Sequence, residues 1–161
     1  MWERLLCAID QFETGQTALA FVAGVASANQ SNVRVLHIRQ VSRVPHSLPL
    51  ETPIEAEELV RDAVRTLQTL GVAADGRSCS VQQEHVAKRI VHEALHWECQ
   101  ALVLGSRRLR GIDRLSSGGV RERILRQSFL PVLVAPAAES NGIYWPPRFR
   151  SDRDSATTSG R

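Results

Sequence analysis

Short apolar runs alternate with longer amphipathic segments along most of the chain. Leu5–Ile9 and Ala101–Leu104 are apolar runs of strand length, which is typical of strands buried on both faces of a sheet. Val33–Ile38 and Pro131–Pro136 predict two further strands, and Ser78–Val81 predicts a short, weaker one. The pattern therefore predicts five strands separated by segments long enough to be helices.

The segments between the runs carry apolar residues at helical spacing. The clearest start signal is Thr52-Pro53-Ile54-Glu55, which supplies a capping hydroxyl, a proline at the first helical position and a capping-box carboxylate. Gly71 is suited to end this helix. Thr14 is expected to cap an earlier helix. Two later helices are expected around Ala87–Leu95 and, with Ile124 and Leu125 on its apolar side, from Val120 onward.

Five successive strand–helix units predict an α/β fold. We expect one domain with an open five-stranded parallel sheet and helices on both faces, in a Rossmann-like arrangement. Ligands of such sheets bind beyond the carboxyl ends of the strands, where the strand order reverses. The domain is expected over residues 1–138, and the polar, arginine-rich segment 139–161 is expected to be a disordered tail.

Composition narrows the class of protein. Apolar residues make up 43% and charged residues 23% of the chain, as in soluble globular proteins. The formal net charge of +3 and the lack of interleaved aromatic residues make a nucleic-acid partner an unfavoured hypothesis, although seven arginines lie between Arg107 and Arg126. No secretory signal and no apolar stretch of bilayer length is apparent, so we expect a cytoplasmic protein without a membrane partner.

Two features of the sequence, its cysteines and a His-Glu-x-x-His segment, are typical of thiol or metal chemistry. The rest of the sequence supports neither. Three widely spaced cysteines (Cys7, Cys79 and Cys99) are expected to be reduced thiols, with Cys7 in the core. His92-Glu93-Ala94-Leu95-His96 has the spacing of a zinc hydrolase helix. The apolar residues of this helix lie on the opposite side, so both histidines are expected to face solvent, and no metal requirement is predicted.

A glycine- and arginine-rich segment, Gly105 to Gly119, follows the fourth predicted strand. Glycine at a strand exit lets the backbone approach a ligand, and the amides at a helix start bind anions. No Gly-Lys-Ser/Thr follows, which excludes a Walker-type phosphate loop. A phosphate-binding loop and an ordinary surface turn both remain open at this point.

The chain resembles the universal stress proteins from Leu5 to Pro136. The resemblance rests on four stretches at predicted strands: Cys7-Ala8-Ile9-Asp10, Val35-Leu36-His37-Ile38, Val103-Leu104-Gly105-Ser106-Arg107 and Val132-Leu133-Val134-Ala135-Pro136. It implies the sheet shared with the adenine nucleotide α-hydrolases. The Gly-Ser that usually follows the aspartate in this family is Gln11-Phe12 here.

The resemblance also implies a nucleotide site. The ATP-binding branch of the family has Gly, two residues, Gly, nine residues, Gly, then Ser or Thr. Gly105 and Gly118 match the first and third glycines, but Arg108 replaces the second and Gly119 replaces the hydroxyl residue. Arg108 would either block the phosphate path or pair with phosphate oxygens. By resemblance, Asp10 would contact adenosine and the backbone of Ile38 would meet adenine. The candidate nucleotide-binding residues are Asp10, Ile38, Gly105, Arg107, Arg108, Gly118, Gly119 and Val120.

The leading hypothesis is a non-catalytic stress-response module. It would bind ATP or AMP, have at most a very slow ATPase activity, act on an unidentified signalling protein, and form a homodimer through the Pro131–Pro136 strand. One alternative is a degenerate member that binds no nucleotide and acts as a dimeric protein-interaction module. Another is an enzyme of the adenine nucleotide α-hydrolase kind, against which the lack of an evident nucleophile, base or metal set argues.

Overall fold

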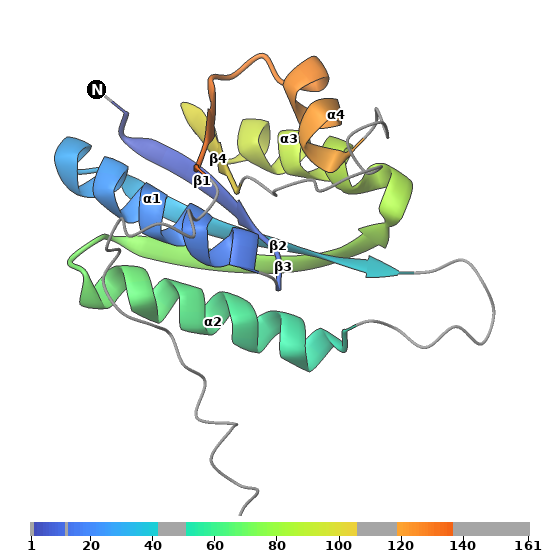
Figure 1. Ribbon diagram of the computed structural model, residues 1–161, viewed down its shortest axis with the longest axis horizontal. Coiled ribbons are helices and arrows are strands. Elements are labelled where there is room, and N and C mark those ends of the chain that lie inside the picture. The colour runs from blue at the N-terminus through green and yellow to red at the C-terminus, as the bar shows by residue number, and fades with distance from the viewer. Residues whose placement is uncertain (1, 12, 42–50, 106–118, 137–161) are drawn as a thin grey trace, which may run out of the picture.

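All five strands pair in parallel into one sheet, in the order β3-β2-β1-β4-β5 (Figure 1). The computed structural model describes residues 2–11, 13–41, 51–105 and 119–136. The strands are β1 (Arg4–Ile9), β2 (Asn32–Val41), β3 (Ala74–Gln82), β4 (Ala101–Leu104) and β5 (Val132–Val134). The helices are α1 (Glu13–Asn29), α2 (Pro53–Thr69), α3 (Val86–His96), which follows the 3-10 turn η1 (Gln83–His85), and α4 (Val120–Gln127). The predicted α/β fold is confirmed.

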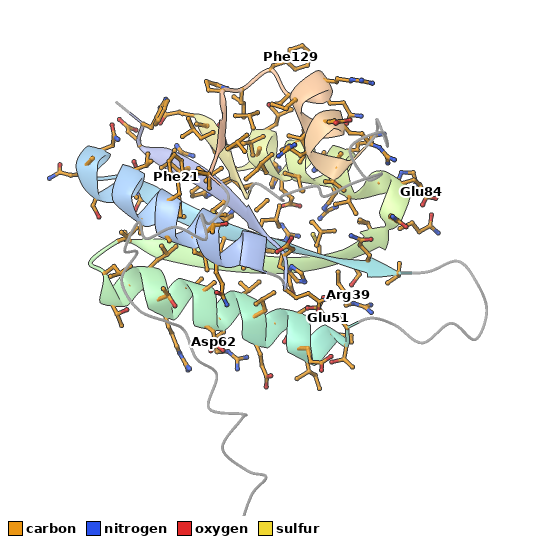
Figure 2. The ribbon with its side chains drawn as sticks, viewed as in Figure 1. Phe21, Arg39, Glu51, Asp62, Glu84 and Phe129 are labelled. Atoms are coloured by element: carbon orange, nitrogen blue, oxygen red, sulfur yellow. The ribbon has the colours of Figure 1, made fainter. Side chains whose placement is uncertain are left out.

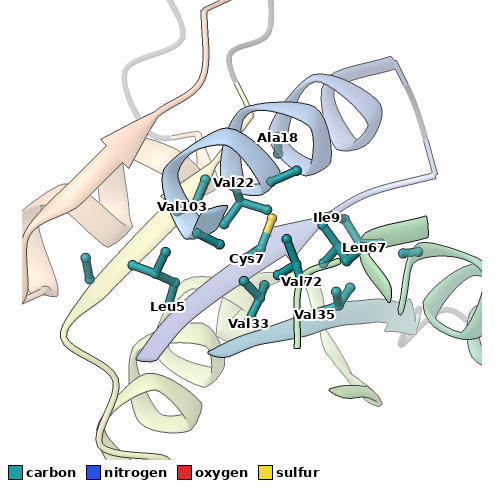
Figure 3. Close-up of a cluster of buried hydrophobic side chains, with 14 residues drawn as sticks. Leu5, Cys7, Ile9, Ala18, Val22, Val33, Val35, Leu67, Val72 and Val103 are labelled. Atoms are coloured by element: carbon teal, nitrogen blue, oxygen red, sulfur yellow. The ribbon is translucent and has the colours of Figure 1, made fainter. Parts of the chain in front are cut away.

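Helices α1 and α2 cover one face of the sheet and form the larger core. Alternate residues of β1, among them Leu5 and Cys7, point to this face and pack against Val22 of α1 and Leu67 of α2 (Figure 3). Leu5 and Cys7 are fully buried, as predicted for Cys7. Burying a side chain the size of Leu5 contributes about 1.5–3 kcal/mol, so this layer fixes the position of β1 in the centre of the sheet.

Helices α3 and α4 cover the opposite face. Leu6 of β1 and Leu102 of β4 point there and pack against Ile90 of α3 and Ile124 of α4. Because β1 alternates its side chains between two apolar layers, its sequence is a continuous apolar run without polar alternation. Leu95 and Leu125, which we expected on the apolar sides of these helices, are each half exposed instead.

The ends of α2 follow the sequence closely. Thr52 Oγ1 accepts from the Glu55 amide at 3.2 Å, and the Glu55 carboxylate accepts from the Thr52 amide at 2.8 Å, which completes the predicted capping box. At the other end Gly71 has φ +78°, a left-handed conformation that glycine adopts without strain. The prediction that Thr14 caps α1 is wrong, because α1 already begins at Glu13.

Three strands differ by more than one residue in length from the prediction, and the first is β2, which spans Asn32–Val41 rather than Val33–Ile38. β3 spans Ala74–Gln82 rather than Ser78–Val81, because an edge strand with a largely exposed, polar sequence still pairs along the whole of β2. β5 spans only Val132–Val134 rather than Pro131–Pro136, since neither proline has an amide hydrogen for the ladder. β5 nevertheless lies at a sheet edge, as expected.

Several predictions fall on residues outside those described. These are the tail at 139–161, with the domain boundary at 138, and most of the arginine-rich segment. Within the described ranges, no helix has both the length and the apolar character needed to cross a membrane.

Candidate functional site

The sheet reverses its strand order between β1 and β4. From β1 the chain builds outward through β2 to β3, then crosses to the other side and continues with β4 and β5. Asp10 follows β1 directly, and Gly105 follows β4 directly. Because Ala8 pairs with Leu104, Asp10 and Gly105 lie at neighbouring strand ends. The structure therefore brings these two predicted site residues together at the switch point, where doubly wound sheets bind ligands.

The end of β2 is the third strand end next to the switch point. β1 ends at Ile9, which pairs with His37. β2 continues to Val41, and in this last part it pairs with β3 but no longer with β1. Ile38 is the first residue past that stop; its side chain is buried toward α3. The edge of β2 that faces β1 therefore extends past the end of β1. The backbone groups on this part of the edge are suited to hydrogen bonding with a flat, polar ring.

Asp10 is held by the first turn of α1. Its Oδ1 accepts a hydrogen bond from the amide of Gly15 at 2.9 Å. A Cβ added to Gly15 would lie 2.3 Å from the carbonyl oxygen of Asp10, so a side chain there would push the helix and the strand end apart. The sequence predicted a role for Asp10 but not for Gly15, whose only visible signal is its position near the start of a helix.

The start of α4 supplies amide groups to the same side of the sheet. Because β4 and β5 are parallel, the intervening α4 runs back, and its N-terminus lies toward the carboxyl ends of the strands. Gly119 is the N-cap residue and Val120 the first helical residue; Gly119 offers no side-chain cap. The first amides of a helix lack intrahelical acceptors and favour anions. Arg107, Arg108 and Gly118 lie outside the described residues.

Sequence reasoning missed a buried polar pair beside the crevice. His37, in β2, places its Nδ1 3.0 Å from the carbonyl oxygen of Ile9 and its Nε2 2.7 Å from Oε2 of Glu51. Glu51 directly precedes the N-cap of α2. A histidine within the apolar run of a buried strand was the available signal, since a buried ring nitrogen needs a partner.

The His-Glu-x-x-His segment is arranged against catalysis by a metal. His92 and His96 are exposed, as expected, and their rings stack with centroids 6.2 Å apart. Glu93, the general base of such a motif, is buried and forms ion pairs with Arg89 at 2.6 Å and Arg77 at 3.2 Å. Across the part of the chain that the structure describes, no group of three or more His, Cys, Asp or Glu residues is placed to hold a metal ion.

The described cysteines are poor nucleophiles. Burial raises the pKa of the Cys7 thiol strongly and that of Cys99 to about 11. Burial also raises the pKa of Cys79, although Arg89 nearby opposes this effect. With raised pKa values these thiols stay protonated near neutral pH, and the thiolate is the reactive form.

A hollow of about 440 Å³ lies away from the crevice, between α2 and the exposed edge strand β3. Its lining includes Glu57, Arg61 and Arg65 of α2 and Ser78 of β3. It is an open groove at the β3 edge of the sheet, whereas the switch point lies between β1 and β4.

The strand order defines a doubly wound α/β protein whose switch point, where such sheets bind ligands, lies between β1 and β4. The chain matches the universal stress protein family over residues 1–136 and belongs to that family. No curated protein sequence matches the chain significantly.

Solved structures agree with this assignment. A protein from the universal stress protein family from Burkholderia pseudomallei is 25% identical, with a TM-score of 0.66 over 84% of this chain and 96% of that chain. A universal stress protein from Archaeoglobus fulgidus in complex with dAMP is 22% identical, with a TM-score of 0.61 over 83% and 98% of the two chains. A universal stress protein in complex with cAMP is 15% identical, with a TM-score of 0.68 over 85% and 99%. The last two likenesses concern the fold.

Proposed function

We propose that this chain binds an adenine nucleotide, ATP or AMP, in the crevice between β1 and β4 and acts as a non-catalytic stress-response module. The proposal rests on the placement of three predicted site residues at the ends of three adjacent strands. These are Asp10 after β1, Ile38 in the part of β2 that extends past β1, and Gly105 after β4. The complexes of structural neighbours with dAMP and cAMP support the choice of an adenine nucleotide.

Each wall has a role suited to one part of the nucleotide. The backbone past Ile38 would pair with the adenine edge, and the Asp10 carboxylate would accept hydrogen bonds from ribose hydroxyls. The amides at Gly119 and Val120 would receive the phosphates at the start of α4. In these roles the residues bind the nucleotide, and the proposal assigns them no chemical step.

The first test is the identity of a co-purified ligand. The full chain, purified without added nucleotide, would be measured intact by native mass spectrometry and again after denaturation. We expect an adenine nucleotide that is released on denaturation and rebinds when added back. Protein that carries no nucleotide and takes up none at millimolar ATP would contradict the proposal.

Gly119 favours a second candidate, the interaction module without nucleotide. The hydroxyl residue of the ATP-binding pattern is absent there, so one phosphate contact is missing. Under this alternative the crevice stays without nucleotide, and the homodimer carries the function. The same mass measurement separates the two, because only the first candidate requires a bound nucleotide.

We further propose a homodimer through β5. This strand is an apolar edge of only three residues, and an uncovered apolar edge favours aggregation. Val134 on β5 is an exposed apolar side chain, and so is Phe129, which precedes the strand (Figure 2 labels Phe129). Pairing two β5 strands about a two-fold axis would cover both edges.

A further inference from the structure

The buried polar pair of His37 and Glu51 has no role in the proposed function. The two side chains are only 5% and 8% exposed, and their atoms approach to 2.7 Å. A buried pair of this kind costs desolvation and is retained only where its geometry is well satisfied. Its position beside the end of β1 therefore needs a physical explanation.

The hydrogen-bond chemistry of the pair fixes its role. The Ile9 carbonyl oxygen can only accept, so Nδ1 of His37 must carry a hydrogen. Nε2 and the Glu51 carboxylate then share a second hydrogen, whichever of them holds it. Both ring nitrogens are thus occupied by the protein. His37 is not free to exchange a proton with a ligand, and its role is to hold other groups in place.

The groups that it holds border the site. Ile9 immediately precedes Asp10, whose carboxylate is held in turn by the Gly15 amide. On the other side, Glu51 joins the start of α2, and its backbone carbonyl accepts from Arg39 of β2 at 3.4 Å. Figure 2 shows Arg39 and Glu51 together, where the end of β2 meets the start of α2.

We propose that His37 is a positioning residue of the nucleotide site. By donating to Ile9, the imidazole fixes the peptide that leads into Asp10, and Glu51 fixes the orientation of the imidazole. A rigid support of this kind keeps a binding side chain in its productive orientation. The inference rests on the proposed function, since it states how Asp10 is held ready for a nucleotide.

Two substitutions separate the two hydrogen bonds. In His37→Asn the amide nitrogen takes the place of Nδ1 and can still donate to Ile9, but it cannot reach Glu51. In His37→Gln the amide nitrogen takes the place of Nε2 and can still donate to Glu51, but the Ile9 carbonyl loses its bond from the imidazole. Each variant removes one of the two buried hydrogen bonds of the imidazole, so both are expected to lower the thermal midpoint. His92→Gln, on an exposed histidine, is the control.

The experiment measures ATP affinity and the exchange rate of the Gly15 amide in the full-length variants. The first amides of a helix have no intrahelical acceptor, so the exchange of this amide reports its bond to Asp10. We expect His37→Asn and His92→Gln to stay within threefold of the wild type in both quantities. We expect His37→Gln to bind ATP at least tenfold more weakly and to exchange Gly15 at least tenfold faster.

Equal losses in the Asn and Gln variants, or wild-type values in His37→Gln, would overturn the proposal, because a merely structural role predicts effects that follow stability alone. If the wild type binds no ATP, the proposed function fails, and the Gly15 exchange still decides whether His37 positions Asp10. If His37→Asn does not fold, the comparison is made with Glu51→Leu added to it, which removes the buried carboxylate left unpaired in that variant.

Discussion

Gly15 lets the first turn of α1 lie directly against the backbone of Asp10. The hypothetical Cβ at Gly15 meets the Asp10 carbonyl oxygen at 2.3 Å, and the Gly15 amide binds the Asp10 carboxylate at 2.9 Å. The usual Gly-Ser after the aspartate is replaced by Gln11-Phe12 in this chain. Close approach at the strand end is therefore provided by a glycine further along.

Gly15→Ala is expected to destabilise the protein. The added methyl group meets backbone, which cannot rotate away, and overpacking of this kind costs about 1–3 kcal/mol. Gly24→Ala in the same helix is the control: nothing lies within 4 Å of its hypothetical Cβ, so alanine should stabilise by about 0.5–1 kcal/mol. Urea unfolding measures both. Equal stability of the two variants would show that Gly15 does not pack as described.

Cys99 predicts a dependence of stability on alkaline pH. Burial raises its folded-state pKa to about 11, whereas an unfolded thiol titrates near about 8.5. Between these values the unfolded chain has lost a proton that the folded chain keeps, so the free energy of unfolding falls as pH rises. Below that window the contribution is fully present. Urea midpoints at pH 7.5 and 10 should differ less in Cys99→Ala than in the wild type, and an unchanged difference would refute this.

Individual contacts were only partly predictable from the sequence. Asp10 and Gly105 could be placed because each ends an apolar run, and strand ends meet at one edge of a parallel sheet. The His37–Glu51 contact could not, because it joins residues fourteen positions apart across a connection with no periodic pattern. The hydrogen-bond partner of a residue such as His37 depends on the tertiary fold and not on the neighbouring sequence.

At the scale of elements, predictability followed the strength of local signals. α2 was predicted well because its capping box and its terminal glycine act within a few residues. β3 was predicted too short, because its pairing with β2 comes from backbone hydrogen bonds that do not depend on an apolar pattern. α1 was given the wrong cap, because the carboxylate that binds its first turn belongs to the preceding strand end.

The start of α4 permits a test of the missing hydroxyl. Gly119 has φ −58°, and no atom of the described residues lies within 4 Å of a hypothetical Cβ, so serine fits there without backbone strain. Gly119→Ser should tighten ATP binding by about 0.5–1.5 kcal/mol, the usual net value of one hydrogen bond. Gly119→Ala adds the carbon without the oxygen and should not tighten binding. Equal affinities of the two variants by calorimetry would remove the hydroxyl from the account of this site.

The β5 edge permits a test of the dimer. Leu133 packs against the core, so its replacement would mix folding with assembly, whereas Val134 is 37% exposed. Val134→Arg should give a monomer in sedimentation experiments, because two arginines would meet across the two-fold axis. Ile54→Arg on α2, at a side chain 69% exposed, is the control and should leave the dimer intact. A dimer in Val134→Arg would place the interface elsewhere.

At the scale of the whole molecule, the position of the site follows from topology. Five parallel strands joined through helices α1 to α4 by right-handed crossovers leave few strand orders, and reversal after β3 creates one switch point between β1 and β4. This much was predictable from the alternation of apolar runs. The identity of the ligand is chemical rather than topological, and it depends on single positions such as Asp10 and Gly119.

The most direct test of the account is calorimetric titration of ATP into the full chain and two matched variants. Asp10→Asn keeps a side-chain oxygen for the Gly15 amide but replaces the other oxygen, which would accept from the ribose hydroxyls, with a donor group. Asp62→Asn makes the same chemical change on the exposed side of α2 (Figure 2). We expect the wild type and Asp62→Asn to bind ATP alike, and Asp10→Asn to bind it at least tenfold more weakly. No binding to the wild type, or equal binding to all three proteins, would contradict a nucleotide site at the β1–β4 switch point.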